Sequence, residues 1–575
     1  MIPPSSIANR RRDIPAAVGL FVATAAFVLW QNSRVAVLWD LSYLLDVSHR
    51  IALGQVPYRD FPLVHPPLTF LVQAALECLG GRHYFLTIGY AAAAGGLGTV
   101  LAWRIILRVL QIPMAWTISL LLAAPLCFVG IYSIYPHPIY DCDCALAILL
   151  AILLLQRCLA DIGRGWRSAA AAGFASVLPV FFKQNIGGPF LIAVVAGLLV
   201  LLGARRWSRD AGVLPERAIL VQVLCSILAG VVVGLVLIQS LWGLGNYLRW
   251  TVHFAAERRL PGLGEMFAVY RQPSFVWTLP VLSAGLLLLH TRLAARWWGK
   301  ALALGLAAAP FAGSLVFLIL DDDLDERADN LLALWPLLLL AGGVMAIFEL
   351  GKGLTGEGLT AGRVMPFVVL AAIHGTFLSQ QLWGSTYAIW PLLMILVAYL
   401  LGALPLGSGW VRPALAATIC TTFAVCGGLY AVGHERLNYA QIPDAPIMRA
   451  ALPALHGMST SGPYIPDFEE LVRFAEREIP SQDGILLLPG EEPFYYATGR
   501  TPQFPVQIFD HTTDPYSAEE LMAEARRRGI KWVVVKTRLQ SNEDPLPERE
   551  RTLELIAQEF ALCRRLDAFD VYLRR

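Results

Sequence analysis

Long apolar runs separated by short polar segments dominate the first three quarters of the chain. A helix needs about 20 mainly apolar residues to cross the hydrocarbon core of a bilayer. Run lengths of this order predict an α-helical polytopic membrane protein with about thirteen transmembrane helices. The predicted spans are 14–31, 84–103, 114–133, 144–160, 168–182, 186–203, 219–241, 275–291, 301–320, 331–349, 364–381, 387–406 and 413–432.

The Lys and Arg residues of the loops predict which side of the membrane each loop occupies. With the N-terminus in the cytoplasm, the inner loops hold more of these residues than the outer loops do, as the positive-inside rule requires. Residues 10–12 are all Arg and precede the first apolar run, which no small-residue cleavage site closes. We therefore expect a retained first helix rather than a signal peptide, and a C-terminal end outside the cytoplasm.

The last part of the chain is more charged and has a different pattern. Short apolar runs at 485–488 and 532–535 are typical of buried strands. Residues 517–528, which begin with the cap-like Ser517, and residues 549–564 have the pattern of amphipathic helices. The predicted domains are a transmembrane domain at 1–432, a linker at 433–466 and a small soluble α/β domain at 467–575.

The segment between the first two spans, residues 31–83, is predicted to lie on the outer surface. Its apolar positions recur at helical spacing over 41–52, which is typical of a helix at the membrane interface, and we assign Asp46 to the solvated face of that helix. Pro66-Pro67 can open a second helix, because proline is tolerated in a first turn. That helix, predicted at 67–79, is too short to span.

Composition agrees with a membrane protein. The chain of 575 residues is 56% hydrophobic and 15% charged, whereas a soluble domain carries about 25% charged residues. The net charge of +2 gives no reason to expect a nucleic-acid partner. The cysteines lie mostly in apolar runs, where they fit buried hydrophobic positions better than a disulfide framework.

Two motifs in the outer segment carry a family resemblance. Asp40 follows the first span and Tyr43 comes three residues later. Then come Gly-x-x-Pro-Tyr-x-Asp-Phe at 54–61 and His-Pro-Pro-Leu at 65–68. This arrangement resembles the GT-C glycosyltransferases, most closely the bacterial members related to aminoarabinose transferase and protein O-mannosyltransferase. The resemblance implies about a dozen spans, a first outer loop with two interfacial helices, and often a soluble outer C-terminal domain.

By this resemblance, Asp40 matches the catalytic Asp of the family, whose implied role is to take a proton from the acceptor hydroxyl. Read from the chain alone, Asp40 could equally be an N-cap residue of the interfacial helix. Tyr58 and His65 of the same motifs are candidates for substrate binding. The chain departs from many relatives in carrying Leu41 after this Asp, and His65 rather than Lys before Pro-Pro.

The second outer loop brings two carboxylates, Asp141 and Asp143, to the start of a span. Ionisable groups next to hydrocarbon are expensive and often functional. They could bind substrate, or a divalent cation through oxygen ligands, while helix capping is the alternative for Asp143. Relatives often carry an Asp at this point, which favours Asp141. Cys142 and Cys144 lack the second ligand pair of a zinc site.

Three cations at outer ends of spans are candidates for binding a lipid phosphate. Lys183 can act as a counter-ion for phosphate or can simply extend to the interface. Arg258 and Arg259 lie in an outer loop against the positive-inside trend. They can stabilise a phosphate leaving group or be ordinary solvated charges.

These observations predict an enzyme that transfers a sugar from a polyprenyl-phosphate donor to a hydroxyl of a glycan, lipid or protein acceptor on the extracytoplasmic face. No Gly-rich phosphate loop indicates a nucleotide donor. No cofactor is assigned, and a divalent metal stays an open alternative. The rival classes are a secondary transporter and a non-enzymatic membrane scaffold. The expected location is a bacterial inner membrane, with the N-terminus cytoplasmic and the C-terminal domain periplasmic.

Overall fold

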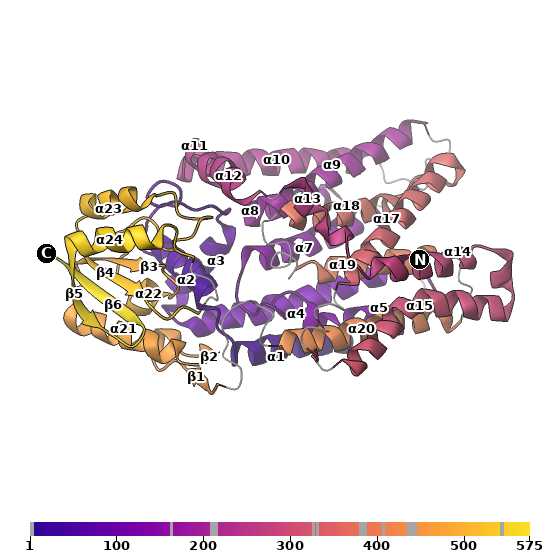
Figure 1. The fold of residues 1–575 in the computed structure, drawn as a ribbon. Helices are drawn as coiled ribbons and strands as arrows, with labels where there is room; N and C mark the ends of the chain where they lie inside the picture. The colour runs from indigo at the N-terminus through magenta and orange to yellow at the C-terminus, as the bar shows by residue number, and fades with distance from the viewer. Residues whose placement is uncertain are drawn as a thin grey trace.

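The chain folds into a bundle of long helices with a small sheet-containing unit at one end (Figure 1). This computed structural model describes residues 5–160, 165–207, 217–260, 262–321, 323–324, 328, 333–378, 388–404, 409–433, 445–540 and 545–575.

Helices coincide with all thirteen predicted spans. Within the described residues, nine helices are long and apolar enough to cross a membrane, and the other apolar helices are shorter, so the count of thirteen stays a prediction. The long helices are α1 (Ser5–Asn32), α4 (Tyr84–Val109), α7 (Tyr140–Ala160), α9 (Gln184–Trp207), α10 (Arg217–Leu241), α15 (Trp297–Leu320), α17 (Trp335–Lys352), α18 (Ala361–Gly375) and α20 (Val411–Val432). The shorter ones are α5 (Ala115–Ala123), α6 (Leu126–Val129), α8 (Trp166–Phe182), α14 (Phe275–Leu289) and α19 (Trp390–Ala403).

The outside of the bundle is apolar. Val276 on α14 and Ile319 on α15 are 85% and 79% exposed. Water would penalise so much apolar surface, whereas lipid does not. The chain is therefore an integral membrane protein.

Two short helices, α2 (Leu38–Ala52) and α3 (Leu68–Gly80), pack against each other between the bundle and the sheet (Figure 1). They fall at the positions predicted for interfacial helices. The loop that follows α10 holds α11 (Leu244–Leu248), a π-helix (Arg249–Phe254), α12 (Ala255–Arg259) and α13 (Leu263–Met266).

The C-terminal unit is built on a four-stranded sheet of order β3-β4-β6-β5. Strands β3 (Gly484–Leu488) and β4 (Ile530–Lys536) are parallel, whereas β6 (Phe569–Arg574) is antiparallel to β4 and to β5 (Phe560–Arg565). Its helices are α21 (Tyr464–Glu478), α22 (Phe494–Thr498), α23 (Ala518–Arg527) and α24 (Arg549–Glu559). Before them, β1 (Ile447–Arg449) pairs with β2 (Ser459–Ser461), within the segment predicted as a linker.

Both predicted strands are present, and Ser517 caps α23 in a capping box with Glu520. The helix predicted at 549–564 is wrong in its last five residues, because α24 ends at Glu559. From Phe560 the backbone pairs with β6 and forms the edge of the sheet. The fold class is confirmed as a polytopic α-helical membrane protein with a small C-terminal α/β domain, while the exact domain boundaries stay a prediction.

The two faces of the sheet have different partners because side chains alternate along a strand. Residues Leu486 and Val533 pack with α23 and α24, whereas Leu487 and Val534 pack in a cluster that also holds α21 and α22. That second cluster includes three residues of α2, namely Leu38, Leu41 and Leu45. Helix α2 therefore belongs to the core of the C-terminal domain as much as to the outer loop.

Candidate active site

Asp40 lies in the first turn of α2 and is half-buried. The N-cap residue is Val37, so the alternative that Asp40 itself caps the helix is wrong. A carboxylate in a first turn is favoured in its ionised form by the partial positive charge of the helix N-terminus. The position therefore suits an ionised acid.

The start of α2 is held by a side-chain amide of the C-terminal domain. The backbone N–H of Leu38 donates to Gln540 Oε1 (2.7 Å), and Gln540 Nε2 donates to the carbonyl of Ala36 (2.8 Å). The neighbouring N–H of Val37 donates to His137 Nε2 (3.3 Å). N–H groups in the first turn of a helix have no partner inside the helix, so these bonds satisfy them and fix where α2 begins.

A buried ionic group lies behind this amide. Lys536 pairs with both Glu491 and Glu492, and the backbone N–H of Gln540 donates to Glu491 Oε2 (2.9 Å). Ser42 of α2 donates to the backbone carbonyl of Glu492 (2.8 Å). Burial raises the pKa of Glu492, although Lys536 opposes the shift. Burial also lowers the pKa of Lys536, but attraction to the two carboxylates outweighs it and leaves that pKa raised.

Asp46 makes a second attachment between α2 and the C-terminal domain. Its carboxylate accepts hydrogen bonds from the backbone N–H of Tyr496 (2.7 Å) and Tyr495 (3.3 Å), near the N-terminal end of α22. The residue is 1% exposed, so its assignment to a solvated face is wrong. Burial raises the pKa of Asp46 to about 7, opposed in part by the Tyr496 N–H and by His49.

Three residues predicted for substrate binding meet at the ends of α7, α8 and α9. Lys183 lies between α8 and α9 and pairs with Asp141 in the first turn of α7. Its Nζ lies 4.8 Å from the centre of the Tyr140 ring, and that ring stacks on His65 at 3.8 Å. Lys183 is only 6% exposed, so its ion pair with Asp141 is buried.

The turn between α8 and α9 explains why Lys183 is fixed. A Cβ atom at Gly187 would lie 2.3 Å from the carbonyl carbon of Pro179, so only glycine allows the two helices to approach this closely. This approach places the residue between them against α7.

Tyr43 connects this cluster to α2. Its hydroxyl lies 3.0 Å from His65 Nδ1, and it lies one turn after Asp40 on the same helix face. Tyr58 is buried and donates to the carbonyl of His65 (2.8 Å), so it supports the position of His65. Burial raises the pKa of Tyr58 well above its usual value.

Asp143 has a different environment. Its oxygens accept hydrogen bonds from the hydroxyls of Thr69 (2.7 Å), Tyr90 (2.7 Å) and Tyr132 (2.5 Å). These groups come from α3, α4 and the loop before α7. Asp143 thus ties α3 and α4 to α7, and its predicted contact with substrate stays a prediction.

Arg258 is exposed and donates to the backbone carbonyl of His511 in the C-terminal domain (3.3 Å). The side chain of Arg259 lies outside the described residues. Of the cations predicted to bind phosphate, Lys183 is therefore in the cluster with Asp141, and Arg258 joins the outer loop to the C-terminal domain.

The predicted metal alternative has no complete ligand set in the described ranges. Among those residues, no three His, Cys, Asp or Glu side chains converge as metal ligands would. Asp141 pairs with Lys183 and Asp143 accepts three hydroxyl bonds. A divalent cation stays a prediction.

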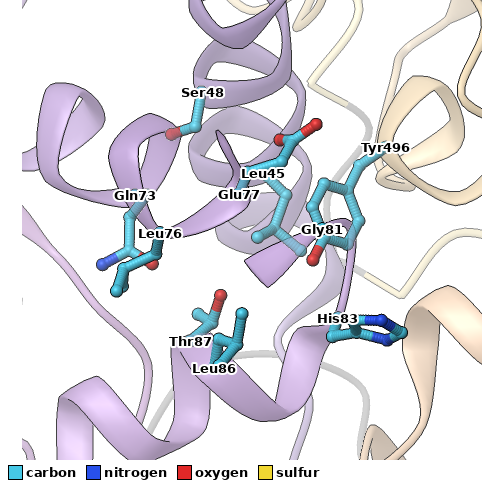
Figure 2. A pocket seen from close by; sticks show the side chains of 10 residues that line it. All are labelled: Leu45, Ser48, Gln73, Leu76, Glu77, Gly81, His83, Leu86, Thr87 and Tyr496. Atoms are coloured by element: carbon cyan, nitrogen blue, oxygen red, sulfur yellow. The ribbon is translucent and has the colours of Figure 1, made fainter. Parts of the chain in front are cut away.

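A small pocket lies beside α2, between α3 and the start of α4 (Figure 2). Its volume of about 10 Å³ matches one water molecule. Gln73 and Glu77 line it, and Glu77 also bonds His49 at 2.6 Å. Because Tyr496 forms one wall, this pocket belongs to the contact between α2 and the C-terminal domain.

Comparison with known proteins gives matches to solved structures. No family model matches the chain, and no curated protein matches it. The chain is similar to ArnT from Cupriavidus metallidurans bound to undecaprenyl phosphate, with 16% sequence identity, 96% of this chain and 97% of that chain covered, and a TM-score of 0.42. It is also similar to the Archaeoglobus fulgidus oligosaccharyltransferase in complex with Zn and sulfate, with 12% identity, coverage of 90% and 68%, and a TM-score of 0.48.

A third similar structure is the Archaeoglobus fulgidus oligosaccharyltransferase AglB in complex with an inhibitory peptide and a dolichol-phosphate, with 13% identity, coverage of 90% and 69%, and a TM-score of 0.46. The second and third of these structures are named as oligosaccharyltransferases. Because each TM-score lies below 0.5, the function proposed below rests on the residues of this chain.

The contact at Asp46 predicts a pH-dependent stability. The pKa of Asp46 in the folded protein lies above the ordinary 3.8, so the protonated carboxyl group contributes its full stabilisation of the fold below about pH 4. This stabilisation is lost as the pH rises through 7. We expect the melting temperature in detergent to fall between pH 5 and pH 8, and to fall less in Asp46→Asn. An equal fall in both proteins would contradict this. The exposed Asp567→Asn is the control.

The two hydrogen bonds between Gln540 and the start of α2 predict that a substitution of Gln540 destabilises the protein. Gln540→Ala removes both bonds to the start of α2 and leaves buried backbone groups unpaired, at a cost of about 1–3 kcal/mol. Thermal unfolding in detergent should show this loss, whereas the exposed control Gln558→Ala should unfold as the wild type does. Equal stability of the two variants would show that the amide does not hold α2.

The ion pair of Lys183 and Asp141 predicts that substitutions of the two residues have strongly coupled effects on stability. Asp141→Asn leaves a buried cation without its partner, which destabilises a protein by about 3–5 kcal/mol. The double variant Asp141→Asn/Lys183→Met should lose less than the sum of the single losses. A thermal-unfolding double-mutant cycle measures this, and strictly additive losses would argue against a direct pair.

Proposed function

We propose that this protein is a membrane glycosyltransferase that transfers a sugar from a polyprenyl-phosphate donor to an acceptor hydroxyl on the extracytoplasmic face. One observation carries the proposal. An acid in the first turn of α2, Asp40, shares a helix face with Tyr43, which contacts the buried cluster of Lys183 and Asp141. The proposed base, Asp40, is thus connected to the proposed phosphate-binding cation, Lys183, through a short series of side-chain contacts.

In the proposed reaction, Asp40 accepts the proton of the acceptor hydroxyl as its oxygen attacks the anomeric carbon. The bond between that carbon and the phosphate oxygen breaks, and its electron pair leaves with the lipid phosphate. The partial positive charge of the helix N-terminus favours the carboxylate form, which is the form that accepts the proton.

Lys183 is the proposed partner of the leaving phosphate. In the structure its charge is balanced by Asp141. Exchange of this carboxylate for the phosphate would place a cation where negative charge develops in the transition state. The stacked rings of Tyr140 and His65 lie next to Lys183. In the proposed reaction they would contact the headgroup as it approaches.

The proposed location of this site is the periplasmic face of a bacterial inner membrane, with the N-terminus cytoplasmic. Loop charges support this orientation. The contact of α2 with the C-terminal domain supports the predicted number of spans, because α2 and that domain must then lie on the same face (Figure 1). The chain must therefore cross the membrane an even number of times between α2 and the C-terminal domain. The twelve spans predicted after the first outer loop meet this condition.

Asp40→Asn tests the proposed base. We expect sugar transfer to fall by about 10²–10⁴-fold, because the amide cannot accept the proton. The readout is mass spectrometry of envelope glycans in a deletion strain that expresses the variant, together with transfer in proteoliposomes made with lipid extract from that strain's parent.

The matched control is Asp60→Asn, since Asp60 accepts a bond from the Val56 N–H in a turn of the same loop. Transfer by Asp40→Asn at the wild-type rate would exclude Asp40 as the base. Loss in both variants, with normal amounts of folded protein, would show that the assay does not separate the two carboxylates.

A further inference from the structure

His137 is a buried imidazole in the loop before α7, and its two ring nitrogens have different partners. The residue is 1% exposed. Its Nε2 accepts the backbone N–H of Val37 (3.3 Å), and its Nδ1 lies 3.1 Å from the Oδ1 atom of Asn32 at the end of α1. The hydroxyl of Tyr84, at the start of α4, lies 3.1 Å from the same Nδ1. The ring thus joins the start of α2 to α1 and α4.

These partners allow only one protonation state of the ring. The side-chain amide of Asn32 donates from Nδ2 to the carbonyls of Val28 (3.0 Å) and Pro136 (2.8 Å). Its Oδ1 therefore faces His137 as an acceptor, and Nδ1 of the ring carries the proton. Nε2 then has a lone pair for the N–H of Val37, whereas a protonated ring would place an N–H against that N–H. His137 is therefore a neutral imidazole that accepts a hydrogen bond from the backbone.

The N–H that His137 accepts is one that an acid in the first turn of a helix ordinarily accepts. Val37 is the N-cap residue of α2, and Asp40 lies at the third helical position. In a capping box, the acidic side chain at this position accepts the N–H of the N-cap residue. Helix α23 shows this arrangement, because Glu520 accepts the N–H of Ser517 (2.9 Å). At α2, the imidazole of His137 takes the place that the carboxylate of Asp40 would have in a capping box.

A carboxylate that caps its own helix is a weaker base than one that does not. A hydrogen bond donated to a carboxylate stabilises its ionised form and so reduces its attraction for a proton. The imidazole satisfies the N–H of Val37 without adding charge at the start of α2. The phenol rings of Tyr84 and Tyr135, whose centres lie 6.5 Å and 5.4 Å from that of His137, are also uncharged at neutral pH. The ring thus completes the helix start and leaves the basicity of the acid unchanged.

We propose that His137 is a positioning residue for the proposed base. It accepts the N–H of Val37 in place of Asp40, so that the carboxylate does not cap its own helix and can act on the acceptor hydroxyl. The catalytic part of this inference rests on the proposed glycosyltransferase function. The capping part concerns only the hydrogen bond at the start of α2, so the two parts are tested separately.

A thermal-unfolding cycle in detergent tests the capping part. His137→Phe removes the acceptor and retains an aromatic ring. In the wild-type background the carboxylate of Asp40 can then accept the released N–H, whereas in an Asp40→Ala background it cannot. We therefore expect His137→Phe to lower the melting temperature more in Asp40→Ala than in the wild type. His137→Leu, whose side chain is smaller, should give the same result. Equal falls in the two backgrounds would overturn the proposal.

Kinetics in the proteoliposome assay test the catalytic part. In His137→Phe, kcat should fall by about 10–100-fold at an unchanged KM, because a misplaced base slows proton transfer. The acid limb of the profile of kcat/KM against pH should move to lower pH, because a carboxylate that accepts an additional N–H stays ionised at lower pH. A residue with only a structural role would change the amount of folded protein and leave this limb in place.

Two further variants serve as controls for the kinetics. His137→Gln keeps a neutral acceptor at the end of the side chain and should restore the wild-type acid limb. His374→Phe removes another imidazole, on α18, whose Nε2 accepts the hydroxyl of Tyr270 (2.6 Å), and should also keep the wild-type limb.

An acid limb that stays in place in His137→Phe, or that moves equally in His137→Gln, would overturn the positioning role. Wild-type transfer by Asp40→Asn would instead remove the proposed base. Coupling of His137 and Asp40 in the unfolding cycle would then still establish the capping relation, so failure of the proposed function and failure of this inference remain distinct.

Discussion

The structure depends on one constraint, which is that the first turn of α2 cannot satisfy its own backbone N–H groups. The partner that completes this turn, Gln540, lies 502 residues away from Leu38 in the chain. The outer loop that carries Asp40 is therefore not a self-contained element. Two hydrogen bonds from Gln540 of the C-terminal domain hold the start of α2, so the end of the chain helps to position a residue that follows the first span.

Apolar and polar contacts have different roles in this docking. The cluster that joins Leu41 to the sheet is non-directional and supplies most of the attraction. Buried charges at Asp46 and Lys536 lose hydration there, and their pairing returns only part of that loss. The hydrogen bonds that Asp46 and Ser42 make with the C-terminal domain do, however, fix the rotation and register of α2, because each forms only in a narrow range of directions.

The parts of this architecture that could be predicted from the sequence are local. A span is a run of apolar residues, and the motifs from Asp40 to His65 lie within one loop. The burial of Asp46 and the hydrogen bonds of Gln540 to α2 could not be predicted, because the partners of both residues come from distant segments. In its own helix or loop, each of the two looks like a surface residue. The strand from Phe560 was missed for the same reason, because its partner β6 decides between strand and helix.

The buried pair of Lys183 and Asp141 adds a physical condition to the proposed reaction. An unpaired cation at the edge of the hydrocarbon would be strongly disfavoured, so Lys183 needs an anion before a donor arrives and again after the phosphate leaves. Asp141 meets this need in the structure. In the proposed reaction, Asp141 would also compete with the phosphate and so weaken binding of the donor headgroup and of the product alike. The carboxylate that keeps the cation buried would thus allow the lipid phosphate to depart, as turnover in that reaction requires.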